Sequence, residues 1–152
     1  GWAKVKKVPP KLQMGTVQPV ADEKTLEAVI ANRYEVMARY AGEMRRACKG
    51  EIEVLKAKGA DLSVLKGAKR WLHRDDDKVP ASARQNLAQA RAAHPVLDKM
   101  VTMREELRQM WLNTSQSREQ LTAELAGWCH RAEASGIAAL QDFSVRLRAA
   151  RA

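Results

Sequence analysis

The side chains that could carry out chemistry in this sequence are few and scattered. None of the histidines, His73, His94 and His130, lies three or four residues from another, as a helical metal site would require. His130 follows Cys129 directly, so the two side chains point to different sides of a helix and do not form a nucleophile–base pair. The sequence also lacks a glycine-rich phosphate loop, a nucleophile elbow and the ligand spacing of a zinc site. We therefore expect no catalytic residue, no metal site and no cofactor in this chain.

The most suggestive cluster is the stretch from His73 to Asp77, in which three aspartates follow a histidine and an arginine. Clustered carboxylates can hold Mg²⁺ for phosphoryl transfer. Three consecutive aspartates are more typical of a solvated loop or of the cap of the next helix. Arg74 and Lys78 also offset part of their charge. A loop is therefore the favoured interpretation, and a magnesium-dependent enzyme is the alternative.

The positive charge is concentrated at the start of the chain. The net charge is +9, and residues 1–20 contribute four lysines and no acid to it. Basic segments bind phosphate groups of nucleic acids or of lipid headgroups, and charge alone does not distinguish the two. A tryptophan beside lysines is typical of a membrane–water interface. The residues expected to contact a membrane surface or phosphates are Trp2, Lys4, Lys6, Lys7 and Lys11.

The elements that would position these residues are helices. Residues 1–21 contain three prolines and two glycines, and we expect them to form an extended basic linker. Residues 22–152 carry apolar side chains at helical spacing, and no segment alternates with a period of two. The sequence predicts an all-α domain, a helical bundle of about five to six helices with a long first helix.

The helix boundaries follow from capping residues and helix breakers. The first helix is expected from Asp22 to Gly59, with Tyr34 and Tyr40 flanking its apolar stripe and a bend at Gly42 and Gly50. The later helices are expected from Asp61 to the acidic run, from Pro80 to Ala93, from Pro95 to Asn113, from Ser117 to Ser135, and from Ile137 onward. Trp71, Trp111 and Trp128 lie on apolar faces and are expected to pack in the core.

The cellular setting is suggested by what the sequence lacks. Cys48 and Cys129 are the only cysteines and suggest no disulfide framework, which favours a reducing compartment. The sequence shows neither a long apolar run nor the apolar core of a signal peptide. The chain begins at Gly1 and not at methionine, so we expect a processed chain or a fragment of a longer protein.

The first of two resemblances rests on residues 1–10 (GWAKVKKVPP), 34–37 (YEVM), 70–78 (RWLHRDDDK) and 104–111 (REELRQMW). These stretches resemble the C-terminal cytosolic region of bacterial membrane fatty acid desaturases, which are di-iron oxidoreductases of lipid metabolism. The resemblance implies an accessory domain on the inner face of the bacterial inner membrane. Its implied partners are the membrane domain of the parent desaturase or its electron donor, and anionic lipid headgroups bound by the basic arm.

The second resemblance spans residues 62–150 and rests on residues 65–72 (LKGAKRWL), 104–111, 134–137 (ASGI) and Trp128, Leu140 and Phe143. These positions resemble the helical insertion of DDE transposases of bacterial insertion sequences, which implies contact with DNA. The histidine boxes of the desaturase and the carboxylate triad of the transposase are both missing, so neither activity is expected here. The leading expectation is a non-catalytic desaturase domain. The alternative is a truncated transposase domain that contacts DNA.

Overall fold

The computed structural model describes residues 23–149, and its elements are all helical within that range. It has seven α-helices and one short 3₁₀ helix. These are α1 (Glu23–Ala31), α2 (Arg33–Ala57), α3 (Ser63–Ala68), η1 (Asp76–Lys78), α4 (Ala81–Ala93), α5 (Pro95–Leu112), α6 (Arg118–Glu133) and α7 (Ala138–Ala149). The predicted all-α bundle is confirmed. The predicted linker, residues 1–21, lies outside the described residues.

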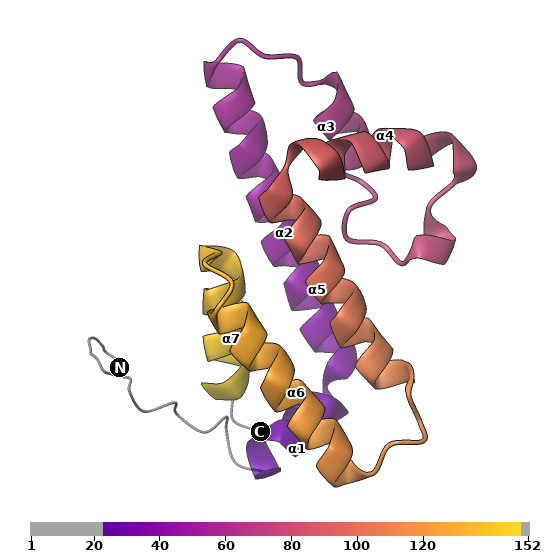
Figure 1. The fold of residues 1–152 in the computed structure, drawn as a ribbon, viewed down its shortest axis with the longest axis vertical. Helices are drawn as coiled ribbons and strands as arrows, with labels where there is room; N and C mark the ends of the chain where they lie inside the picture. Colours follow the sequence, from indigo (N-terminus) through magenta and orange to yellow (C-terminus); the bar gives the residue numbers. More distant parts are fainter. Residues whose placement is uncertain (1–22, 150–152) are drawn as a thin grey trace, which may run out of the picture.

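The two longest helices, α2 and α5, form the spine of the bundle (Figure 1). Helices α6 and α7 pack together and against this spine, and α1 contacts α7, α6 and the start of α2. Helices α3 and α4 pack on each other and, with η1, form a lobe beside the spine (Figure 1). The lobe matters for function because the turn that follows α3 returns to the surface of α2 and α5.

The long first helix predicted from Asp22 to Gly59 is interrupted at Asn32, which gives one helix more than the sequence suggested. The Asn32 side-chain amide donates a hydrogen bond of 2.9 Å to the carbonyl oxygen of Ala28. Asparagine competes in this way for helical acceptors, which explains why the break falls there. Helix α2 runs without interruption through Gly42 and Gly50, where a bend was expected.

Three aromatic side chains from three helices form the centre of the core. Tyr40 of α2, Trp128 of α6 and Phe143 of α7 meet edge to face, with ring centroids 5.1 to 6.1 Å apart. Tyr40 donates a hydrogen bond of 2.6 Å to the Met100 carbonyl oxygen, and Trp128 donates one of 2.9 Å to that of Met103. Both acceptors belong to α5, so these buried polar groups join α2 and α6 to α5.

The sequence placed Tyr40 incorrectly, and Trp71 and Trp111 only partly as expected. Tyr40 was expected to flank the apolar stripe, but it is fully buried at the centre of the core. Tyr34 is 79% exposed. Trp128 is buried as expected, whereas Trp71 and Trp111 are only half-buried. The buried residues of α2 are Val36, Tyr40, Met44, Cys48 and Ile52, which is the i, i+4 spacing of one helical face.

Several helix ends follow the capping rules that the sequence suggested. Ser117 and Gln120 form the predicted capping box at the start of α6. Pro95 occupies the first turn of α5. Gly59 and Gly136 adopt positive φ angles of 68° and 77°, which residues with a β-carbon rarely adopt.

The second predicted helix is shorter than expected. Asp61 precedes it and accepts a hydrogen bond of 2.9 Å from the Ser63 backbone N–H, but α3 ends at Ala68. Residues 69–73 continue as turns, in which the Trp71 N–H donates to the Ala68 carbonyl oxygen at 2.8 Å. Leu72 is buried and holds this turn against the core. The chain therefore reaches residues 73–75 as an irregular segment and not as a helix.

Replacing Trp128 by alanine should destabilise the fold far more than replacing Trp111. We expect Trp128→Ala to lower the free energy of unfolding by about 3–5 kcal/mol. The substitution leaves a cavity at the centre of the core and removes the hydrogen-bond donor to the Met103 carbonyl oxygen. Trp111→Ala should cost less than half of that, since Trp111 is half-buried and its indole N–H has no hydrogen-bond partner. Urea unfolding followed by circular dichroism measures both losses. Equal losses would contradict the described core.

Candidate nucleic-acid interface

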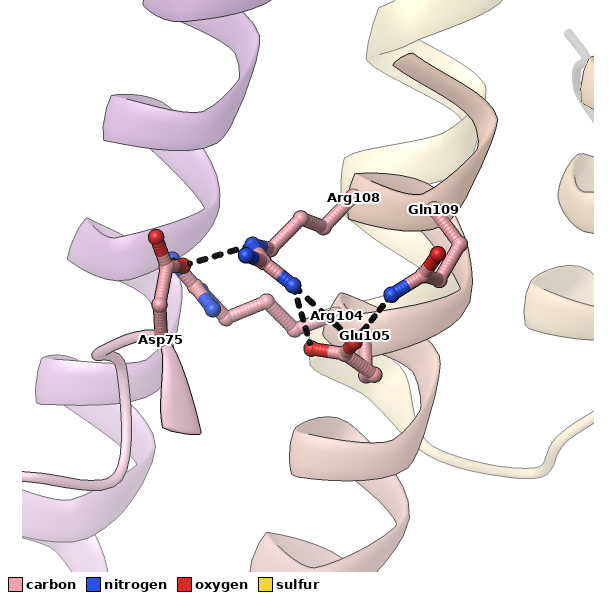
Figure 2. Close-up of polar contacts among 5 residues, drawn as sticks. All are labelled: Asp75, Arg104, Glu105, Arg108 and Gln109. Atoms are coloured by element: carbon pink, nitrogen blue, oxygen red, sulfur yellow. Dashed lines mark hydrogen bonds and ion pairs between the residues drawn. The ribbon is translucent and has the colours of Figure 1, made fainter. Parts of the chain in front are cut away.

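Asp75 fixes the turn after α3 to helix α5. Its Oδ1 atom lies 2.9 Å from a guanidinium nitrogen of Arg104 and 3.1 Å from Nε of Arg108 (Figure 2). Arg104 and Arg108 are four residues apart and therefore lie on one face of α5. Glu105 in turn accepts hydrogen bonds from Arg108 at 3.1 Å and from Gln109 at 2.7 Å. The result is a polar network that holds residues 73–75 beside α5.

This network also lowers the pKa of Asp75. Partial burial by itself would raise it, but the hydrogen bonds and positive charges of Arg104 and Arg108 outweigh that effect. Asp76 pairs instead with Arg84 at 3.1 Å, and Asp77 is exposed. The three aspartates thus face different partners. Among residues 23–149, no three His, Cys, Asp or Glu side chains are placed to share a metal ion.

His73 lies among positive charges. Its Nδ1 atom is buried without a hydrogen-bond partner, and so is the Nε atom of Arg104. Burial of the ring lowers the pKa of His73, and the charges of Arg45, Arg74 and Arg104 lower it further. No carboxylate is among the groups that shift it. The imidazole is therefore neutral at pH 7, in surroundings that favour an anion.

The exposed cations around His73 form the surface that we call the His73 basic surface. It comprises Arg45 of α2 and Lys69, Arg70 and Arg74 of the turn after α3. The charge of Lys69 also acts on Cys48, which places this lysine over α2. The Arg70 guanidinium lies 5.2 Å from the centre of the Trp71 ring, which orients it.

These four cations differ from most arginines of the bundle. Within the described part of the chain, none of the four forms an ion pair with a carboxylate. Several arginines elsewhere are neutralised: Arg91 pairs with Asp98 at 2.6 Å, Arg131 with Glu106 at 2.8 Å and Arg148 with Glu133 at 2.6 Å. Exposed lysines such as Lys49 and Lys99 also form no ion pair within the described residues, so the His73 basic surface is distinguished by its three unpaired arginines. Clustered cations of this kind attract phosphate groups.

The structure places the residues that the sequence singled out in different surroundings, and some of them lie outside the described range. Trp2, Lys4, Lys6, Lys7 and Lys11 lie outside the described residues, so their role stays a prediction. His94 accepts or donates a hydrogen bond of 2.9 Å with Glu51, and His130 is exposed. Burial raises the pKa of Cys129 to about 11, so its thiol is protonated at neutral pH.

Sequence reasoning missed the His73 basic surface. Three of its four cations lie in residues 65–74, a stretch with four cations and no acid, and the other, Arg45, lies on α2. The contribution of this stretch to a binding surface was underestimated, because the sequence does not reveal which cations are neutralised by distant carboxylates. Arg104 and Arg108 form ion pairs with Asp75, about thirty positions earlier in the chain. Arg45 and Arg74 form no ion pair with a carboxylate within the described residues.

The fold and this surface together define a basic all-α helical domain. A comparison with protein families matches residues 17–152 to a family described as transposases, the ISL3 group of the DDE class. Because the match covers most of the chain, this chain belongs to that transposase family. No curated protein and no solved structure matches the chain significantly.

The desaturase interpretation is therefore wrong. Part of its support came from residues 1–10, which lie outside the transposase match, and residues 70–78 and 104–111 fall within that match. Those two stretches carry the Asp75–Arg104 pairing and the basic turn, which belong to the transposase fold. Among the described helices, none combines the length and the apolar character needed to cross a membrane.

Replacing Asp75 by asparagine should weaken the fold mainly above pH 4. Its folded-state pKa lies below the unfolded-state value of about 3.9, so the ion pairs stabilise the fold above that pH. This stabilisation disappears as the pH falls through the folded-state pKa. We expect Asp75→Asn to cost about 1 kcal/mol at pH 7, because the carboxylate is partly exposed.

The matched control is Asp76→Asn, since the Asp76 side chain is 84% exposed. Urea unfolding at pH 7 and at pH 2.5 measures both variants. The loss caused by Asp75→Asn should shrink at the lower pH. A loss that is the same at both values, or that Asp76→Asn matches, would show that the network does not stabilise the fold.

Proposed function

We propose that this chain is a DNA-contacting helical part of a transposase, and that the His73 basic surface binds phosphates of the DNA backbone. The observation that carries the proposal is the group of exposed, unpaired cations at the junction of α2 and the turn after α3. The family match supports it, because transposases act on DNA. In this proposal the chain contributes binding and not catalysis.

The chemistry of the surface suits the phosphodiester backbone. Guanidinium groups bind phosphate oxygens through charge-assisted hydrogen bonds, and three of the four cations are arginines. Binding releases counterions from the DNA, so affinity falls as salt rises, with a log–log slope of about −0.9 for each phosphate contacted. Four contacts correspond to a slope of about −3.6. Contacts of this kind carry no direct sequence information, so binding by this surface is not sequence-specific.

The neighbouring acids support a role in binding and not in metal catalysis. Asp75 is occupied by Arg104 and Arg108, and Asp76 by Arg84. These pairings orient the basic turn toward solvent and leave its cations available. The carboxylates thus shape the surface without belonging to it.

Reversing charges on the His73 basic surface should abolish most DNA binding. We expect the double variant Arg45→Glu, Arg74→Glu to bind a short duplex at least about tenfold more weakly, with a shallower salt slope by about two units. Fluorescence anisotropy at about 50 mM and about 200 mM salt measures both quantities. The control is Arg131→Glu, which reverses one exposed arginine of α6 that is already paired with Glu106.

The control variant should bind within about twofold of the unaltered chain, since rim charges distant from the contact have small effects. The proposal fails if the duplex binds equally well to the double variant and to the control. It also fails if the unaltered chain does not bind the duplex at low salt, because phosphate contacts are strongest there.

A further inference from the structure

A second basic feature lies between α2 and α7 and is separate from the His73 basic surface. It is a groove of about 400 Å³, lined by Arg39, Gly42, Glu43, Arg46, Phe143, Arg146 and Leu147. Phe143 and Leu147 belong to the core and are each 5% exposed, so they form a narrow apolar floor that the aliphatic stems of the arginines extend. A groove with these walls could hold an apolar side chain with negatively charged groups beside it.

The arginines of this groove are held together by a single carboxylate. Arg46 lies 2.6 Å and Arg146 lies 2.8 Å from the same oxygen, Oε2 of Glu43. One negative charge therefore holds two guanidinium groups that repel each other. Their side chains remain 68% and 67% exposed, so both can bind a further anion.

Arg39 adds a third cation to the rim, and its side chain is 61% exposed. Among the described residues it pairs with Glu35, which is itself mostly exposed and lies one turn earlier on α2. Exposed pairs of this kind are weak, so an incoming anion can compete with Glu35 at little cost. The groove therefore presents an apolar floor and three guanidinium groups.

Charge complementarity calls for an acidic ligand, and the floor shows which class fits best. A phosphodiester backbone presents charge but no apolar side chain for the floor. A peptide segment with an apolar residue between acidic residues satisfies both features, because its side chain covers Phe143 and Leu147 while its carboxylates meet the arginines. A β-carbon at Gly42 would meet only the guanidinium groups of Arg45 and Arg46, at 3.8 Å or more, so a larger side chain has room there.

We infer that the α2–α7 groove docks an acidic protein segment that carries an apolar anchor residue. This interaction would give the chain a protein partner in addition to DNA, on a different set of residues. It does not depend on DNA binding by the His73 basic surface.

The test uses the whole chain and a fluorescein-labelled peptide of Glu-Glu-Leu repeats. A second peptide of Glu-Glu-Ser repeats keeps the charge and removes the apolar anchors. We expect the leucine peptide to bind at least about tenfold more tightly, because burial of each leucine on the floor adds affinity that charge alone does not. Anisotropy measures both dissociation constants.

Two variants block the groove in different ways. Gly42→Leu fills it and Arg146→Glu reverses one of its charges, and each should weaken binding of the leucine peptide about tenfold. The matched controls are Gly50→Leu on the same helix, where a β-carbon meets nothing within 4 Å, and Arg131→Glu on α6. Circular dichroism confirms that each variant keeps its helices, and the controls should bind like the unaltered chain.

Four outcomes would overturn the inference. The leucine peptide does not bind; the two peptides bind equally, which indicates charge alone; the controls weaken binding as much as the groove variants; or Arg146→Glu loses duplex DNA affinity, which would make the groove part of the DNA surface. If duplex binding fails for the unaltered chain while the peptide results hold, the proposed DNA function is wrong and the docking site stands.

Discussion

The pairing of Asp75 with Arg104 and Arg108 is the interaction on which the functional surface depends. It fixes an irregular turn against a regular helix, and the turn could otherwise adopt many conformations at considerable entropic cost. Asp75 is taken up by these pairs, and neither Arg45 nor Arg74 forms an ion pair within the described residues. The turn that Asp75 fixes therefore carries exposed positive charge beside α2.

The core supports this arrangement from beneath. Tyr40 and Trp128 donate buried hydrogen bonds to carbonyl oxygens of α5, the helix that carries Arg104 and Arg108. Met100 and Met103, which supply those oxygens, are completely buried, so α5 has little freedom to shift relative to α2. The same core contributes Phe143 to the floor of the α2–α7 groove. Both proposed binding surfaces thus rest on one rigid set of contacts.

The sequence predicted the parts of the fold that depend on local residues. Ser117 with Gln120, Pro95 and Gly59 marked helix ends that the structure confirms, because caps and glycine turns act within a few residues. The break at Asn32 was not predicted, although the hydrogen bond that marks it joins residues only four apart. The central position of Tyr40 was not predicted because it depends on how the helices pack. The basic surface was missed for a similar reason. Ion pairs such as Asp75 with Arg104 join residues far apart in sequence, and they decide which cations stay free.

The most direct test of the account is an NMR titration of the isotope-labelled chain with a short DNA duplex at low salt. The account predicts that amide signals of residues 45 and 69–74 shift most, together with the imidazole signals of His73. Signals of α7 should remain in place, because that helix packs mainly on α6, α1 and α2. Shifts confined to residues 1–16 or to α7, with none at residues 69–74, would contradict it.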